Sequence, residues 1–173
     1  DPNELLEKLM DLTLDAVGAE RGLIILFDEE SGSMSVKIAR NLENETIKDA
    51  GRYSHSIVKQ AKAGKSILTV DATNDKRFKK SKSVSLYDIH SLMCVPLRIQ
   101  NRIIGTVYLD SRKSGPFFTE EDLAFVEALA NHAAIAIEKA QLYSNLKKEN
   151  ELLRSTALDR YQYSNIIGKS AGM

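Results

Sequence analysis

The first seventeen residues have the pattern of an amphipathic helix. Pro2 stands near the start and Gly18 follows the end, which is the usual punctuation of a helix. Between them, apolar residues recur at roughly helical spacing, at Leu5, Leu6, Leu9, Leu12 and Val17. We therefore predict a helix over residues 2–17.

Shorter apolar runs predict a sheet. The strands are expected at residues 22–27, 34–39, 66–70, 91–99 and 102–110. The first two flank a polar turn and so form a β-hairpin. A second helix fits residues 54–63, with Ser54 as its N-cap and Gly64 as its stop.

The polar stretch 71–89 is long for a compact domain, and loops of this length tend to be lids or binding loops. It carries a basic cluster of Lys76, Arg77, Lys79, Lys80 and Lys82. The cluster could contact an anionic ligand. A solvated loop is the commoner reason for such a run and is the interpretation that we favour.

The C-terminal third of the chain predicts one long helix. Thr119 and Asp122 have the spacing of a capping box, and the helical pattern then continues to about Leu158. The order of helices and strands is that of an α+β domain, an antiparallel sheet with helices on one side.

The last two strands meet at Gln100-Asn101, and a two-residue turn there decides which side chains share a face. One predicted face mixes large apolar groups with a hydroxyl, a phenol and a carboxylate, in the pairs Ile99–Arg102, Leu97–Ile104, Val95–Thr106, Met93–Tyr108 and Ser91–Asp110. The other face is small and apolar, with Leu92, Cys94, Pro96, Gly105, Val107 and Leu109. The mixed face has the composition of a ligand pocket, or else is half exposed to water. The small face suits helix packing.

Charge and cysteine content narrow the possible partners and the possible cellular compartment of the protein. Lys plus Arg equals Asp plus Glu at 24 each, so nothing attracts the chain as a whole to nucleic acid or an anionic membrane. The single cysteine, Cys94, is typical of a cytoplasmic protein and is predicted to be a buried packing residue. No apolar run is long enough to span a bilayer. The chain lacks an initial methionine and is interpreted as a fragment of a longer protein.

Catalytic and metal motifs are missing. Gly168-Lys169-Ser170 resembles the end of a phosphate loop, but Tyr163 stands where that loop needs glycine. The histidines His55, His90 and His132 have no partners at ligand spacing. The sequence favours a binding module without a metal site over an enzyme.

Five segments, taken in order, resemble a GAF domain: residues 14–22, 75–78, 91–97, 104–110 and 118–123. The resemblance covers about the first 140 residues. It implies a sheet with the terminal helices on one face and a small-molecule pocket, with loops, on the other. With the mixed face as that pocket and residues 75–88 as its roof, the predicted ligand-binding residues are Phe78, Tyr87, Ser91, Met93, Val95, Thr106, Tyr108 and Asp110.

The subtypes of the family leave the ligand unnamed. Cyclic-nucleotide-binding members carry Asn-Lys, then Phe, then Asp-Glu; Phe118 and Asp122 match, whereas Asp110-Ser111 and Leu123 depart from this pattern. Bilin-binding members need a cysteine in the pocket, and Cys94 is predicted on the opposite face. Methionine-sulfoxide-reducing members use several cysteines. The cofactor is therefore unknown.

The tail, residues 161–173, resembles the opening of the AAA+ domain of sigma-54-dependent transcriptional activators of the NtrC and NifA type. The resemblance implies a GAF sensor domain over 1–140, a linker helix over 141–160 and, in 161–173, the poorly ordered first residues of the AAA+ domain. It also implies that the full-length protein continues into an ATPase that remodels sigma-54 polymerase and then into a DNA-binding domain.

The linker helix has a heptad pattern with a at Ala136, Tyr143, Asn150 and Ala157 and d at Lys139, Leu146 and Leu153. An Asn at a between leucines at d fixes the register of parallel dimers. We predict a parallel homodimer whose interface contains Tyr143, Leu146, Asn150 and Leu153. The alternative seam, Ile135, Leu142, Leu146 and Leu153, would suit docking on the domain itself.

The sequence thus predicts a regulatory module that is not itself an enzyme and that makes no direct contact with membrane or nucleic acid. A small molecule in the Tyr108 pocket would change the packing of the terminal helices and so control the ATPase. Two alternatives stay open. One is a ligand-free dimerisation scaffold, and the other is a thiol or redox sensor that works through Cys94.

Overall fold

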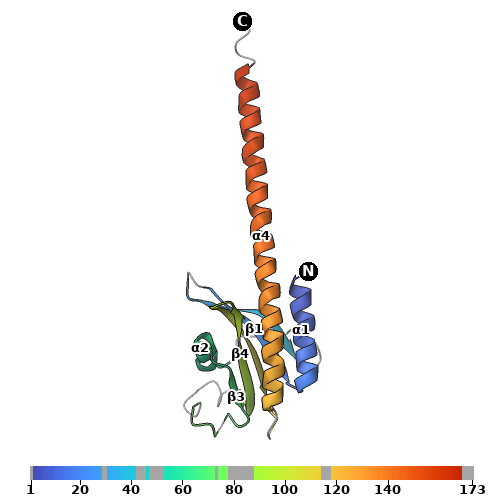
Figure 1. Ribbon diagram of the computed structural model, residues 1–173, viewed down its shortest axis with the longest axis vertical. Helices are drawn as coiled ribbons and strands as arrows, with labels where there is room; N and C mark the ends of the chain where they lie inside the picture. Colours follow the sequence, from blue (N-terminus) through green and yellow to red (C-terminus); the bar gives the residue numbers. More distant parts are fainter. Residues whose placement is uncertain are drawn as a thin grey trace. The chain divides into compact units, whose positions relative to one another are not determined.

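The computed structural model describes residues 2–28, 31–41, 46, 53–72, 74–77, 88–113 and 118–168, with only the backbone for Pro2 and for 159–168. The helices are α1 (Pro2–Val17), α2 (His55–Lys62) and α4 (Glu120–Gly168) (Figure 1). The strands are β1 (Arg21–Phe27), β2 (Met34–Asn41), β3 (Ile67–Thr69), β4 (Ser91–Ile99) and β5 (Arg102–Ser111). The chain divides into two compact units, Asp1–Ala136 and Ile137–Met173.

The strands of the first unit form one antiparallel sheet in the order β2-β1-β5-β4-β3. Helix α1 and the first turns of α4 lie on one side of this sheet and α2 lies on the other (Figure 1). The predicted α+β architecture is confirmed, but the expectation that all helices lie on one side of the sheet is wrong, because α2 covers the other side. Up to the start of α4, each predicted helix and strand is present with its ends shifted by no more than two residues.

The register between β4 and β5 differs from the prediction. The turn at Gln100-Asn101 and the pair Ile99–Arg102 are as expected, but the register shifts between Leu97 and Arg98, so that Leu97 lies opposite Gly105. Ile104 is the extra residue of a β-bulge, and glycine in a strand often marks one. The other predicted cross-strand pairs are therefore wrong by one residue.

The shift exchanges the two faces of β4 relative to β5. Tyr108 lies opposite Cys94, and Met93 lies opposite Leu109. The face covered by α2 thus carries Leu92, Cys94 and Pro96 together with Thr106, Tyr108 and Asp110. The face that meets α1 carries Ser91, Met93, Val95 and Leu97 together with Gly105, Val107, Leu109 and Ser111.

Close packing of α1 on the sheet depends on Gly22 in β1. A Cβ atom at Gly22 would lie 2.3 Å from Met10 Sδ, 3.0 Å from Leu109 Cδ2 and 3.1 Å from Leu14 Cδ2. The lack of a side chain therefore lets α1 approach the strands, and Met10 and Leu14 are buried there.

Helix α4 begins with the predicted capping box. The Asp122 carboxylate accepts hydrogen bonds from the Thr119 backbone N–H at 2.8 Å and from its hydroxyl at 2.9 Å, and Thr119 Oγ1 accepts one from the Asp122 N–H at 3.2 Å. The helix ends at Gly168 rather than near Leu158. No glycine or proline interrupts residues 120–167, which explains the greater length. Residues 161–168 continue this helix, and residues 169–173 lie outside the described residues. The poor order predicted for residues 161–173 stays a prediction.

No helix in the described part of the chain is long and apolar enough to cross a membrane.

Candidate functional site

The sheet face under α2 carries the candidate site. A buried cluster joins the sheet to α2 and the residues around it: Leu23, Ile25, Phe27, Ala39, Tyr53, Ile57, Val58, Ala61, Ile67, Ala72, Ile89, Leu92, Cys94 and Tyr108. The Tyr53 and Tyr108 rings are tilted with their centroids 6.2 Å apart, and Tyr53 stacks on His55 at 4.5 Å. The face is thus largely apolar and aromatic, as in most small-molecule sites.

Tyr108 places a polar atom in this apolar interior. Its side chain is fully buried, and its hydroxyl has no hydrogen-bond partner among the described residues. The Ser54 backbone and the Asp110 carboxylate interact weakly with this hydroxyl and affect its protonation, but neither is placed for a hydrogen bond of normal geometry. Burial raises the pKa of the phenol well above its ordinary value, so the group is a neutral donor and acceptor.

An ion pair lies next to Tyr108 on the same face. Arg21 Nε donates to Asp110 Oδ1 at 3.1 Å, and Arg21 Nη2 donates to Asp110 Oδ2. The side chains are only 10% and 2% exposed. Burial raises the pKa of Asp110 above its ordinary value, while the Arg21 guanidinium opposes this shift. The pair gives the site two fixed charges of opposite sign.

Cys94 lies on this face rather than opposite it, which corrects the predicted position. The thiol is fully buried, and Sγ lies 3.1 Å from Thr106 Oγ1. Burial raises its pKa to about 12, so very little reactive thiolate forms at neutral pH. The predicted burial is confirmed. Position alone, however, no longer argues against attachment of a bilin at Cys94.

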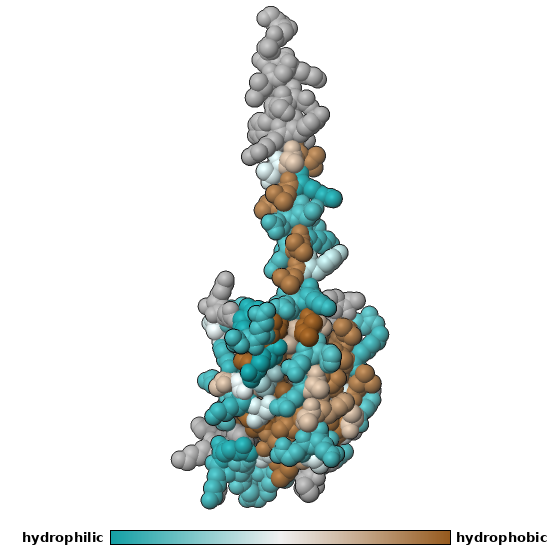
Figure 2. Space-filling model, in the orientation of Figure 1, coloured by the Kyte–Doolittle hydropathy of each residue, from teal (hydrophilic) through white to brown (hydrophobic). Residues whose placement is uncertain are grey.

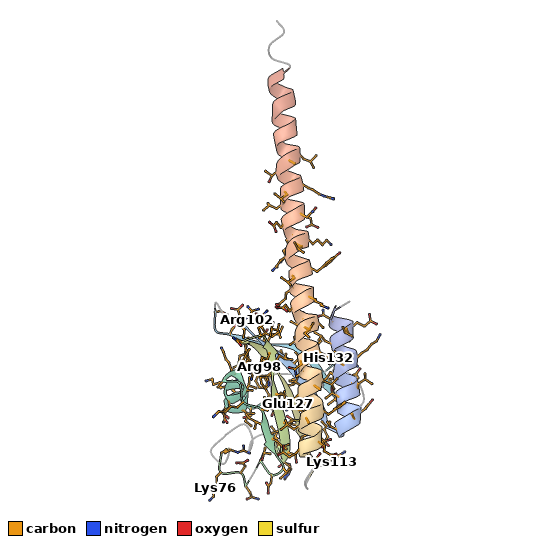
Figure 3. The ribbon with its side chains drawn as sticks, viewed as in Figure 1. Lys76, Arg98, Arg102, Lys113, Glu127 and His132 are labelled. Carbon is orange, nitrogen blue, oxygen red and sulfur yellow. The ribbon has the colours of Figure 1, made fainter. Side chains whose placement is uncertain are left out.

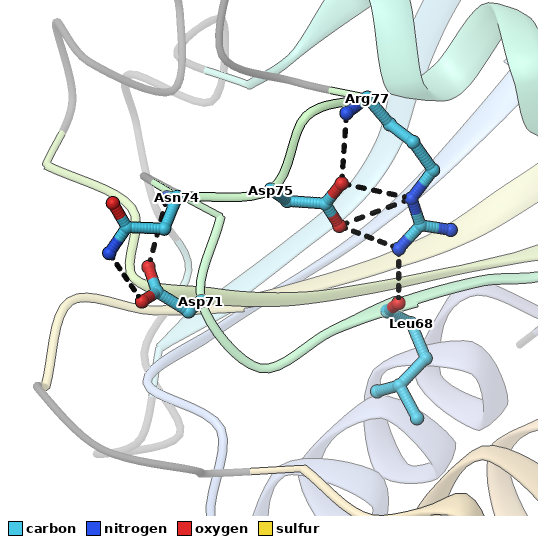
Figure 4. Close-up of polar contacts among 5 residues, drawn as sticks. All are labelled: Leu68, Asp71, Asn74, Asp75 and Arg77. Atoms are coloured by element: carbon cyan, nitrogen blue, oxygen red, sulfur yellow. Dashed lines mark hydrogen bonds and ion pairs between the residues drawn. The ribbon is translucent and has the colours of Figure 1, made fainter.

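The loop after β3 begins with a compact set of polar contacts (Figure 4). The Asp71 carboxylate accepts hydrogen bonds from the Asn74 backbone N–H at 3.1 Å and from its side-chain amide at 2.7 Å. The Asp75 carboxylate accepts from the Arg77 guanidinium at 2.6–3.1 Å, and Arg77 Nη2 also donates to Leu68 O at 3.0 Å. Arg77 is exposed, but its contacts with Asp75 and Leu68 O tie the loop to β3.

Loss of the Arg77 contact should change the pKa of Asp75 measurably. Hydrogen bonds from Arg77 lower the pKa of Asp75 from 3.8 to about 2. Because the pKa is lower in the folded state, the contact stabilises the fold above about pH 4, and this contribution is lost as the pH falls through about 2. We expect Arg77→Ala to move the Asp75 pKa back toward 3.8 in an NMR titration.

Lys76→Ala is the matched control, because Lys76 is an exposed neighbour (Figure 3) and should leave the Asp75 pKa near 2. An Asp75 pKa that stays near 2 in Arg77→Ala would assign the shift to Thr69 and the backbone, which also contribute hydrogen bonds.

The structure brings together only part of the predicted ligand site. Thr106, Tyr108 and Asp110 share the α2 face, whereas Ser91, Met93 and Val95 lie on the opposite face. Phe78 and Tyr87 lie outside the described residues. Sequence reasoning missed Arg21, although an arginine that opens an apolar strand is a signal for a buried ion pair.

His55 lies at this face, where it stacks on Tyr53, but several exposed basic residues and His132 lie away from it. Arg98 and Arg102 lie at the β4–β5 hairpin, and Lys113 lies at the other end of the sheet (Figure 3). His132 is exposed on α4. Within the described ranges, no group of three or more His, Cys, Asp or Glu side chains could hold a metal ion.

The second unit consists of the continuation of α4. Its predicted interface residues Tyr143, Leu146 and Leu153 are 75%, 64% and 63% exposed, and Asn150 is exposed as well. The alternative seam residue Leu142 is 57% exposed.

Comparison with known proteins identifies the family. The GAF domain model matches residues 1–137, and the chain belongs to the GAF domain family. GAF domains are signal-sensing regulatory domains, so this is the class of function that the family assigns.

Two curated relatives illustrate the range of proteins with similar sequences. Dual 3′,5′-cyclic-AMP and -GMP phosphodiesterase 11A of Takifugu rubripes is 33% identical over 101 residues, which are 57% of this chain and 11% of that protein. Nitrogen fixation protein VnfA of Azotobacter vinelandii is 26% identical over an alignment of 187 positions, gaps included, that covers 100% of this chain and 35% of that protein. The chain therefore spans about a third or less of the length of these relatives.

Solved structures agree on the fold. GAF3 from Slr1393 of Synechocystis sp. PCC6803, in its photoproduct state, has a TM-score of 0.70 at 11% identity, with 84% of this chain and 99% of that one covered. The GAF domain from a phosphoenolpyruvate-protein phosphotransferase of Coxiella burnetii has a TM-score of 0.63 at 19% identity, with 84% and 87% covered. At these identities the likeness shows the fold alone.

Proposed function

We propose that this chain is the signal-sensing and dimerising module of a sigma-54-dependent transcriptional activator, and that it binds a small molecule on the α2 face of the sheet beside Tyr108. The observation that carries the proposal is the Tyr108 hydroxyl, which is buried and unpartnered among the described residues. A buried polar group without a partner costs about 1–3 kcal/mol. A ligand that hydrogen-bonds to it would recover part of that cost.

The ion pair beside Tyr108 offers a route from the ligand to the terminal helices. Arg21 follows the end of α1 by four residues. Its neighbour Glu20 accepts hydrogen bonds from Arg112 N at 2.6 Å and from Ser111 Oγ at 3.3 Å. These two donors belong to the residues that directly follow Asp110 in the chain. A ligand that moves the Arg21–Asp110 pair would therefore act on the end of α1 and on the exit of β5 together. Such a ligand controls the output only if it binds the two states with different affinity.

Two observations favour a sigma-54 activator as the full-length protein. The tail resembles the opening of an AAA+ domain of that class. The similarity to nitrogen fixation protein VnfA extends over 100% of the chain and so includes this tail. In this proposal the non-enzymatic GAF module is cytoplasmic, and α4 continues as a parallel coiled-coil linker to an ATPase and a DNA-binding domain.

Replacement of Tyr108 by phenylalanine tests the sensing site. If the hydroxyl is reserved for a ligand, Tyr108→Phe removes an unpartnered buried group, and the free energy of unfolding in urea should rise by about 1 kcal/mol. In the full-length activator, the same variant should weaken the response of a target-promoter reporter to its inducing condition. Tyr53→Phe is the control for loss of a buried phenol on the same face.

The two readouts separate the alternatives. A lower free energy of unfolding in Tyr108→Phe would mean that the hydroxyl is bonded within the fold, and the proposal would lose its main support. Greater stability with an unchanged reporter response would favour the ligand-free scaffold.

A further inference from the structure

The second unit displays apolar side chains that one helix cannot bury. Along it, large apolar residues are 57–75% exposed: Leu142, Tyr143, Leu146, Leu152, Leu153 and Leu158. Figure 2 shows apolar residues recurring between hydrophilic ones along this part of α4. Leu146 and Leu153 belong to both possible seams, so the apolar pattern alone leaves the register and orientation of a partner helix open.

We propose that Glu149 and Arg154 fix this choice, by pairing across a parallel two-stranded coiled coil formed with a second copy of this chain. The inference rests on the dimer in the proposed function and adds the residues that specify it. With Tyr143 and Asn150 at a and Leu146 and Leu153 at d, Glu149 occupies position g and Arg154 occupies position e. In a parallel pair, residue g of one helix meets residue e of the next heptad on the other, five residues further along.

The charges oppose the other arrangements. In an antiparallel pair with the same seam, e faces e and g faces g. The residues at e, Lys147 and Arg154, are both basic, so like charges would meet. In the alternative seam with Leu142, Glu149 falls within the apolar seam and faces its own copy in a parallel pair. Of the three arrangements, only the parallel dimer with Asn150 at a brings opposite charges together.

The pair cannot act within one helix. Residues that interact on a helix surface are three or four positions apart, whereas Glu149 and Arg154 are five apart and point in different directions. Any energetic coupling between them must therefore come from contact between two chains. This makes a double-mutant cycle decisive.

The experiment measures dimer dissociation of the whole 173-residue chain by sedimentation equilibrium for wild type, Glu149→Arg, Arg154→Glu and the double variant. A dimer contains two such pairs, so each single change should weaken dimerisation about fivefold, and the double variant should return to within about twofold of wild type. Lys148→Glu is the control, because position f faces away from the seam; it should change the dissociation constant by less than about twofold.

Mixing the two single variants gives a second readout. One chain then carries arginine at both positions and the other carries glutamate at both, so the mixed dimer restores two attractive pairs and should form in preference to either homodimer. A double variant as weak as the product of the two single effects, or a mixture without preference, would overturn the pairing while leaving the dimer intact. A monomeric wild type would overturn both the pairing and the dimerisation in the proposed function.

Discussion

Replacing Arg21 by alanine is expected to lower the free energy of unfolding by about 3–5 kcal/mol at pH 7, because it leaves the Asp110 carboxylate buried without its cation. The pair is held by two hydrogen bonds, and both side chains are nearly inaccessible to water. Urea unfolding followed by circular dichroism measures the change. Arg98→Ala is the matched control; Arg98 is exposed and donates one hydrogen bond to Gly64 O at 3.1 Å, so its loss should cost less than about 1 kcal/mol.

The loss of unfolding free energy in Arg21→Ala, relative to wild type, should depend on pH; this loss is called the deficit below. Burial raises the pKa of Asp110, and loss of Arg21 removes the main opposing influence. An acid whose pKa is raised by folding destabilises the folded state as the pH rises from its unfolded value, about 4, to its folded value. The deficit should therefore be smaller at pH 4.5 than at pH 7. A deficit below 1 kcal/mol at both values would mean that the ion pair contributes little.

Gly105→Ala should produce the second large effect, a loss of about 3 kcal/mol. A Cβ atom at this position would lie 2.3 Å from the backbone oxygen of Ile25 and 3.2 Å from Leu26 Cα. Both contacts are with the backbone of β1, the neighbouring strand, so relief requires the strands to move apart. Thermal and urea unfolding measure the loss.

Gly22→Ala gives a control with the same chemical change. Its Cβ atom would also lie 2.3 Å from a neighbour, but that neighbour is the Met10 sulfur, at the flexible end of a side chain that can adopt another rotamer. The cost should be smaller, about 1–2 kcal/mol, because Met10 and Leu14 of α1 must shift while alanine also reduces the entropy of the unfolded chain. Equal losses in the two variants would contradict the importance of the β1–β5 backbone contact.

Local signals were enough to predict most of the fold. The Pro2 and Gly18 punctuation, the turn at Gln100-Asn101 and the Thr119–Asp122 capping box each depend on neighbouring residues, and each is confirmed. The residues of β5 were also placed correctly relative to one another, so Thr106, Tyr108 and Asp110 do share a face.

The remaining features depend on contacts between distant parts of the chain. Arg21 and Asp110 are 89 residues apart, and no local pattern pairs them. The unpartnered Tyr108 hydroxyl is a property of the assembled interior. The bulge at Ile104 arises where Gly105 meets β1, so a register deduced from the β4–β5 turn alone could not include it. Its omission moved Ser91, Met93 and Val95 into the predicted site in place of Leu92 and Cys94.

The bulge at Ile104 determines which face of β4 lines the site. Eight of the nine residues of β4 are buried, on both faces of the strand, so hydrophobicity does not distinguish one face from the other. Instead, one extra residue in the hairpin, Ile104, determines which β4 side chains lie beside Tyr108, although Ile104 itself lies outside the site. An insertion or deletion there would replace the whole β4 wall of the site at once, without changing any residue in that wall.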